Sequence, residues 1–239
     1  MPHLPWIIKK RVPMVVGSFG CVSDLQKMPA TLLGSVCDIA EIRMDIIVAE
    51  KGAIVADDWA HFGIFPILFT ARRQDEGGAL ALTAAARMDL LRNTFARASL
   101  IDLEVASIAE MAGILAEMRE LSLPWIASFH DFKGLPSTVL LEENVRRAKD
   151  AGASAFKIAA WLTCPQDLAR LADFQLADHG IPVACMGMGP LAAVSRMLCA
   201  QCGSVLNYGA ISEKVTAPGQ WESLLLKQVM NRLVRFPAE

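Results

Sequence analysis

Eight short apolar segments alternate with longer amphipathic segments along the chain, and this alternation constrains the fold more than any other feature. The apolar segments, each of strand length, are residues 14–19, 39–46, 65–71, 100–105, 125–132, 155–160, 181–186 and 204–209. The clearest helical patterns cover residues 80–98, 108–121, 138–151, 167–178, 191–202 and 221–234. Strands that alternate with helices favour a parallel sheet covered by helices.

Eight such units in 239 residues predict a single-domain (β/α)8 TIM barrel. We expect one catalytic domain over residues 1–239, with residues 1–12 as an N-terminal extension. A doubly wound open sheet is the alternative. However, the sequence has no G-x-G-x-x-G after its first strand and no G-x-x-x-x-G-K-[ST], which disfavours the nucleotide-binding forms of that fold.

The charge balance and the apolar runs exclude several kinds of partner. Lys and Arg total 23 and Asp and Glu total 25, so no overall positive charge draws the chain to nucleic acid or to an anionic membrane. The longest charge-free runs, residues 180–195 and 197–212, have 16 residues each. A membrane span needs about 20 apolar residues. We therefore predict a cytoplasmic protein with no nucleic-acid or membrane partner.

Cys199 and Cys202 form a lone C-x-x-C. A zinc site would need a second pair of ligands, and none of the four histidines lies at a ligand spacing from these cysteines. Both cysteines lie in an apolar stretch, where a thiol behaves as a small hydrophobic group. We therefore predict core packing rather than a metal site.

Charged residues inside the second predicted strand are unusual. Glu41, Arg43 and Asp45 alternate with Ile42, Met44 and Ile46, which places the three charges on one face of a strand. In a barrel that face is the interior, where charges are costly unless they pair or serve a site. An edge strand with one solvated face is the alternative interpretation.

Four other predicted strands carry polar residues at or near their carboxyl ends. These are Arg72, Asp102 with Glu104, His130, and Lys157. His130 alone is more often a structural hydrogen bonder than a proton carrier. Lys157 alone is equally consistent with a lysine that reaches water and with a desolvated, nucleophilic amine. Together they favour a site, because barrel active sites lie at the carboxyl ends of the strands.

Six short motifs give the sequence a family resemblance. They are EIRMD at residues 41–45, FTARRQDEGG at 69–78, SFHDF at 128–132, FKIA at 156–159, MGMG at 186–189 with SR at 195–196, and APGQ at 217–220. In this order they resemble the motifs of type I 3-dehydroquinate dehydratases, which are (β/α)8 enzymes of the shikimate pathway of aromatic amino acid biosynthesis. The resemblance spans nearly the whole chain and is weak only over residues 1–39.

The resemblance implies a mechanism without a metal or an organic cofactor. A lysine, matched by Lys157, forms a Schiff base with the C3 ketone of 3-dehydroquinate. A histidine, matched by His130, removes the C2 hydrogen, protonates the departing C1 hydroxyl and assists imine formation. An acid paired with that histidine is matched by Glu76. Family members are expected to form homodimers.

The same resemblance implies the substrate contacts. Glu41, Arg43 and Arg72 match residues that hold the substrate hydroxyls, and Met186 and Met188 match an apolar wall. Arg196 and Gln220 match residues at the end of the site that holds the substrate carboxylate. Two positions depart from the family. Thr216 replaces a serine and keeps its hydroxyl, and Tyr208 replaces the phenylalanine of the eighth strand.

Two further functions remain open on the residues alone. A class I aldolase or transaldolase would also use a lysine Schiff base, and it would cleave a carbon–carbon bond. A non-catalytic binding barrel would bind a ligand without turnover, although such relatives usually lose the nucleophile or the base. A comparison of quinate-like acids with sugar phosphates as ligands separates the first alternative from a dehydratase.

Overall fold

The computed structural model describes residues 13–211 and 214–234, and these residues form a barrel of eight parallel strands. The strands are β1 (Met14–Ser18), β2 (Ile39–Arg43), β3 (Ile67–Thr70), β4 (Leu100–Glu104), β5 (Trp125–Asp131), β6 (Ala155–Trp161), β7 (Val183–Met188) and β8 (Leu206–Ala210). Their order is β7-β6-β5-β4-β3-β2-β1-β8. A hydrogen bond of 3.1 Å from Val205 N to Val183 O joins the two ends of this order. The predicted TIM barrel is therefore confirmed, and the open sheet is excluded.

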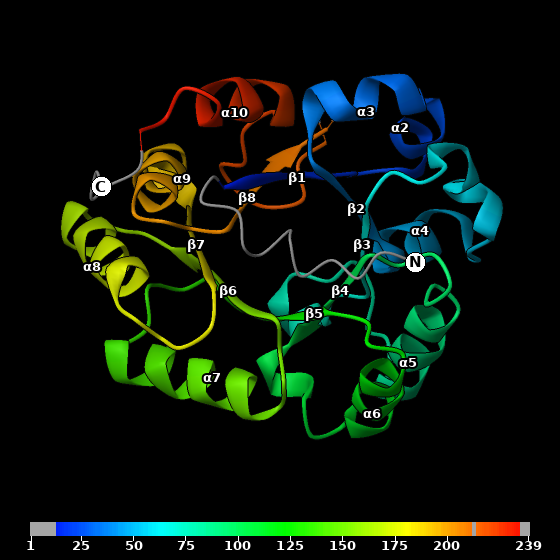
Figure 1. The fold of residues 1–239 in the computed structure, drawn as a ribbon, viewed down its shortest axis with the longest axis horizontal. Coiled ribbons are helices and arrows are strands. Elements are labelled where there is room, and N and C mark those ends of the chain that lie inside the picture. Colours follow the sequence, from blue (N-terminus) through cyan, green and yellow to red (C-terminus); the bar gives the residue numbers. More distant parts are fainter. Residues whose placement is uncertain (1–12, 212–213, 235–239) are drawn as a thin grey trace.

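Helices surround the strands as an outer ring (Figure 1). They are α2 (Val22–Lys27), α3 (Ala30–Val36), α4 (Met44–Lys51), α5 (Ala84–Arg92), α6 (Ala112–Glu120), α7 (Thr138–Asp150), α8 (Pro165–Leu176), α9 (Ala192–Gln201) and α10 (Ser223–Met230). At least one helix follows every strand. The six predicted helices are all present, whereas α2, α3 and α4 were not predicted.

Local capping explains where the observed helices differ from the predicted ranges. The helix predicted over residues 80–98 begins only at Ala84, because Thr83 caps its first turn by accepting a hydrogen bond of 3.2 Å from Ala86 N, and it ends at Arg92. Gly152 and Gly203, which follow α7 and α9, have φ values of +82° and +97°. Glycine adopts this left-handed conformation without a steric cost, and it turns the chain toward the next strand as predicted.

Alternate residues of the strands divide the core into two layers. Outward side chains such as Val15, Ile42 and Phe156 pack against the helices. Inward side chains such as Val16, Ile39 and Leu68 form a second, apolar cluster inside the barrel. Nearer the carboxyl ends of the strands the inward positions become polar. The apolar cluster therefore forms a floor beneath a polar chamber.

Two expectations for residues 39–46 are wrong. Strand β2 ends at Arg43, and Asp45 lies in the first turn of α4 rather than on the inward face of the strand. There Asp45 accepts hydrogen bonds from Arg43 and from the backbone N–H groups of Arg72 and Ala79. The edge-strand interpretation also fails, because β2 pairs with both β1 and β3.

Other predictions have separate outcomes. Cys199 and Cys202 are both buried, as predicted for core residues. No helix in the described parts of the chain is long and apolar enough to cross a membrane. The predicted N-terminal extension, residues 1–12, lies outside the described residues.

Candidate active site

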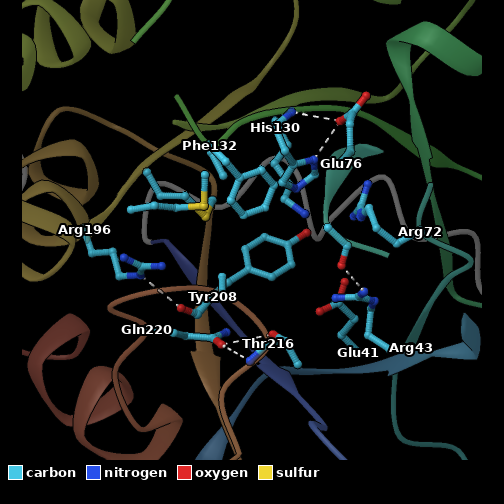
Figure 2. A pocket seen from close by; sticks show the side chains of 16 residues that line it. Glu41, Arg43, Arg72, Glu76, His130, Phe132, Arg196, Tyr208, Thr216 and Gln220 are labelled. Carbon is cyan, nitrogen blue, oxygen red and sulfur yellow. Dashed lines mark hydrogen bonds and ion pairs between the residues drawn. The ribbon is translucent and has the colours of Figure 1, made fainter. Parts of the chain in front are cut away.

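A pocket opens at the carboxyl ends of the strands (Figure 2). Its lining comprises Glu41, Arg43, Arg72, Glu76, Gly77, His130, Phe132, Lys157, Ala159, Met186, Met188, Arg196, Tyr208, Thr216, Ala217 and Gln220. All the catalytic and substrate-binding residues that the family resemblance implies are among them, whereas Asp102 and Glu104, which the sequence also placed at the site, do not line the pocket. The barrel thus brings together side chains that lie up to 179 positions apart, counted as 220 minus 41.

Lys157 projects inward from the middle of β6 and is 4% exposed. Its Nζ donates a hydrogen bond of 3.0 Å to Asp102 Oδ2. Burial lowers the pKa of Lys157 below its ordinary value; the charge of Asp102 opposes this shift and the charge of Arg72 adds to it. A buried lysine beside another cation releases its proton more easily, which makes the amine a nucleophile.

Asp102 is the centre of a buried network beneath the pocket. Its Oδ1 lies 2.9 Å from Arg72 Nη2 and accepts a hydrogen bond of 2.5 Å from Ser128 Oγ. Burial favours the neutral acid, but the charges of Arg72 and Lys157 outweigh it and hold the pKa of Asp102 below its ordinary range. Asp102 is thus a permanent anion that positions the Lys157 amine.

Arg72 is held in this network by a second carboxylate. Its Nη1 lies 2.9 Å from Glu104 Oε1, and Glu104 is in turn paired with Arg87 from α5. All three side chains are buried. A buried charge is tolerated when its partners compensate it, so these pairs fix the Arg72 guanidinium in the wall of the pocket.

His130 and Glu76 form a pair at the mouth of the pocket. Glu76 ends a short 3-10 helix, Gln74–Glu76, in the loop after β3. One oxygen, Glu76 Oε2, lies 2.9 Å from His130 Nδ1 and accepts a hydrogen bond of 2.8 Å from the His130 backbone N–H. The pair leaves Nε2 as the ring nitrogen that can exchange protons with a ligand.

Burial controls the charge of this pair. It raises the pKa of Glu76 to about 8. Burial, together with the charges of Arg72 and Lys157, lowers the pKa of His130 well below its ordinary range. His130 is therefore a neutral imidazole at neutral pH. When Glu76 loses its proton, it accepts the Nδ1 hydrogen and His130 becomes a base at Nε2.

Glu41 and Arg43 lie on the side of the pocket formed by β2. Glu41 accepts hydrogen bonds from Ser18 Oγ and Thr70 Oγ1, at 2.5 and 2.9 Å. Arg43 forms a bidentate salt bridge with Asp45 and also donates a hydrogen bond of 3.1 Å to Gly77 O. Asp45 therefore ties the end of β2 to the loop that carries Glu76.

Arg196 and Gln220 lie on the opposite side of the pocket from Arg72 (Figure 2). Arg196 donates to the backbone oxygens of Gly187, Ala192 and Tyr208, and it has no carboxylate partner among the described residues. Burial lowers the pKa of Arg196 to about 10, which still leaves it charged at neutral pH. An uncompensated buried cation suits the carboxylate of a ligand.

Gln220 and Thr216 form a polar corner beside Arg196. The side-chain oxygen of Gln220 accepts hydrogen bonds of 3.0 Å from both the backbone N–H and the hydroxyl of Thr216. Thr216 therefore orients Gln220. The Nε2 group of Gln220 is left as a donor to a ligand.

The sequence placed Asp102 among the polar strand-end residues of the site but did not show its contact with Lys157, and it gave no site role to Ser128 or Tyr208. Asp102 carried a signal, since it alternates with Glu104 on the inward face of β4. Its contact with Lys157 joins positions 55 residues apart and follows only from the barrel register. Ser128 carried none, because a serine inside a strand is common.

Fold and pocket together define a (β/α)8-barrel enzyme with a buried lysine and a histidine–glutamate pair at the carboxyl end of the barrel. A type I 3-dehydroquinase family model matches residues 21–235. Because this match covers most of the chain, the protein belongs to the type I 3-dehydroquinase family. It is therefore a carbon–oxygen lyase of the hydro-lyase class.

Individual relatives agree with this assignment. The chain is 32% identical to a 3-dehydroquinate dehydratase of Desulfotalea psychrophila, over 91% of this chain and 97% of the relative. It is 28% identical to one of Methanothrix thermoacetophila, over 89% and 88% of the two chains. The crystal structure of 3-dehydroquinate dehydratase from Geobacillus kaustophilus superposes with a TM-score of 0.81 at 25% identity, covering 92% of this chain and 91% of that one.

Proposed function

We propose that the protein dehydrates 3-dehydroquinate to 3-dehydroshikimate through an imine on Lys157, with His130 as general acid and base. The observation that carries this proposal is the buried Lys157 amine, held by Asp102 beside the Arg72 cation in the same pocket as the His130–Glu76 pair. Family membership supports the choice of substrate.

Imine formation is the first step. The neutral Lys157 amine attacks the C3 ketone carbon, and water leaves to give an iminium ion. Asp102 compensates the positive charge of this nitrogen, as it does for the amine at 3.0 Å. The iminium withdraws electrons from C3 and acidifies the hydrogens on C2.

Elimination follows at C2 and C1. His130 Nε2 removes a C2 proton, and the bonding electrons form an enamine. The nitrogen lone pair then re-forms the C=N bond, the C2–C3 π electrons become the C1–C2 double bond, and the C1–O bond breaks. The hydroxyl leaves as water with the proton that His130 carries. Hydrolysis of the product imine releases 3-dehydroshikimate and restores the Lys157 amine.

The two sides of the pocket orient the substrate. Arg196 and the Nε2 group of Gln220 bind the carboxylate, because this side holds the uncompensated cation. Glu41, Arg43 and Arg72 bind ring hydroxyls on the opposite side. The side chains of Met186 and Met188 are buried in the apolar cluster and supply a hydrophobic wall.

Reductive trapping tests the proposal. Borohydride added to the protein with 3-dehydroquinate converts an imine into a stable amine. We expect mass spectrometry to find a ligand-sized increase on the peptide that contains Lys157. The same treatment without 3-dehydroquinate is the control.

The trap also tests the alternatives. No adduct with 3-dehydroquinate in folded protein contradicts the proposed mechanism. An adduct formed only with sugar phosphates indicates an aldolase or transaldolase. Ligand binding with neither adduct nor turnover indicates a binding barrel.

The pH profile tests the proposed role of Glu76. Because burial raises the pKa of Glu76 to about 8, the basic form of His130 increases as pH rises through this value. We expect kcat to rise through about pH 8. In Glu76→Gln the amide oxygen still accepts from the His130 backbone N–H, but the group cannot ionise.

The Glu76→Gln variant should therefore lose this inflection and, at pH 9, show a kcat on the order of tenfold below wild type. The pH dependence that remains belongs to Lys157, whose pKa is also lowered. An inflection that is the same in both proteins excludes Glu76 as its source.

Three expectations stay predictions. They are a homodimeric assembly, a cytoplasmic location and independence from an organic cofactor or metal. Gel filtration with light scattering tests the first.

A further inference from the structure

The hydroxyl of Tyr208 is buried in the pocket without a hydrogen-bond partner. Among the described residues, four buried side-chain polar atoms lack a partner: Asn144 Nδ2, Asn207 Oδ1, Tyr208 Oη and Ser223 Oγ. Tyr208 alone of these four residues lines the pocket. An unpaired buried hydroxyl is unfavourable, and a ligand that enters the pocket can supply its missing partner.

The ring of Tyr208 places this hydroxyl close to the reacting atoms. Tyr208 lies on the inward face of β8, is 4% exposed, and its ring centroid lies 4.2 Å from Lys157 Nζ. Figure 2 shows the ring in the middle of the pocket, with its hydroxyl directed away from Arg196. The hydroxyl therefore faces the side that we assign to the substrate's ring hydroxyls.

We propose that Tyr208 is a specificity-determining residue whose Oη donates a hydrogen bond to the C4 hydroxyl of 3-dehydroquinate. This inference rests on the proposed dehydration through Lys157, since the imine fixes where the substrate ring lies.

Substrate chemistry selects the C4 hydroxyl. Once Lys157 Nζ is bonded to C3, the substituents of the neighbouring ring carbons are the ones nearest to the Tyr208 ring. The neighbours of C3 are C2, which carries only hydrogens, and C4, which carries a hydroxyl. The C4 hydroxyl is therefore the nearest group of the substrate that can accept a hydrogen bond from Tyr208 Oη.

The electrostatic surroundings keep Tyr208 a donor. Burial raises the pKa of the phenol well above its ordinary value, and the negative charges of Asp102 and Glu41 act in the same direction. The phenol thus stays protonated while the Lys157 amine reacts. The ring face also lies against the cation at Lys157, an interaction that phenylalanine would provide equally. The hydroxyl is therefore the part of Tyr208 that packing and charge do not explain.

Tyr208→Phe is the matched variant, since it removes the hydroxyl and keeps the ring. We would measure kcat and KM of both proteins with 3-dehydroquinate and with its 4-deoxy analogue. For 3-dehydroquinate we expect kcat/KM to fall about tenfold, equivalent to about 1.4 kcal/mol, mainly through KM. For the 4-deoxy analogue we expect no difference between the two proteins, because the interaction is already absent.

Thermal unfolding without substrate separates this role from a structural one. Because the phenol has no partner in the described protein, its removal should leave the unfolding temperature of Tyr208→Phe unchanged or raise it. Equal losses of kcat/KM on both substrates, no loss on 3-dehydroquinate, or a lowered unfolding temperature that accounts for the lost activity would each overturn the inference. Failure of the wild-type protein to convert 3-dehydroquinate would instead contradict the proposed function, and the C4 assignment with it.

Discussion

Replacement of Lys157 by alanine is expected to reduce turnover of 3-dehydroquinate by at least about 10⁴-fold, the scale on which covalent enzymes lose activity without their nucleophile. No other lysine lines the pocket among the described residues, so no second amine can form the imine. Steady-state kinetics measure the loss. Borohydride trapping on the same variant should give no ligand adduct.

The Lys157→Ala barrel should remain folded. Asp102 loses one partner but keeps Arg72 at 2.9 Å and Ser128 at 2.5 Å, so its charge stays compensated. Circular dichroism and thermal unfolding check this point. Lys133→Ala is the matched control, because Lys133 is an exposed lysine in the turn after β5 and should keep wild-type turnover. Full activity of Lys157→Ala would end the Schiff-base mechanism.

The buried Lys157 side chain lies in a network of charges that compensate one another. Arg72 pairs with both Asp102 and Glu104, and Glu104 also pairs with Arg87. Lys157 adds one more cation to this group and is placed beside Asp102. The arrangement that makes the amine reactive therefore also compensates its charge when it is protonated.

The barrel could be predicted from sequence because apolar periodicity is strong in its strands and in its longer helices. The sequence of β6 is apolar except for one lysine, and α7 has a clear apolar stripe. The helices α2 and α3 have six and seven residues, too few turns for a helical period to stand out, and the first residues of α4 fall inside the strand predicted over residues 39–46.

The catalytic candidates were predictable to the extent that each carries its own chemical signal. A lysine inside an apolar strand and a histidine at a strand end are unusual in themselves. Asp45 was misplaced, because alternation continues past Arg43 in the sequence although the strand does not. The unpaired state of the Tyr208 hydroxyl was not accessible, since a missing partner is a property of three-dimensional surroundings.

Replacement of His130 by alanine is expected to lower kcat by about 10² to 10⁴-fold, the usual contribution of general acid–base catalysis. The imidazole is the proposed base for the C2 proton and the proposed acid for the departing hydroxyl, so both steps slow. Imine formation should slow as well. The Lys157 amine remains, however, and borohydride should still trap a ligand on it after longer incubation.

Two further measurements distinguish a loss of proton transfer in His130→Ala from a folding defect. Added imidazole should restore part of the rate of His130→Ala, because a small base can occupy the space that the variant leaves, whereas a folding defect would not respond. Exchange of the C2 hydrogen with deuterated water should fall in parallel with kcat. His61→Ala is the control, since His61 is exposed in the short 3-10 helix Ala60–Phe62 that precedes β3 and does not line the pocket. A wild-type kcat in His130→Ala would remove this residue from the mechanism and leave Glu76 without the partner through which it is proposed to act.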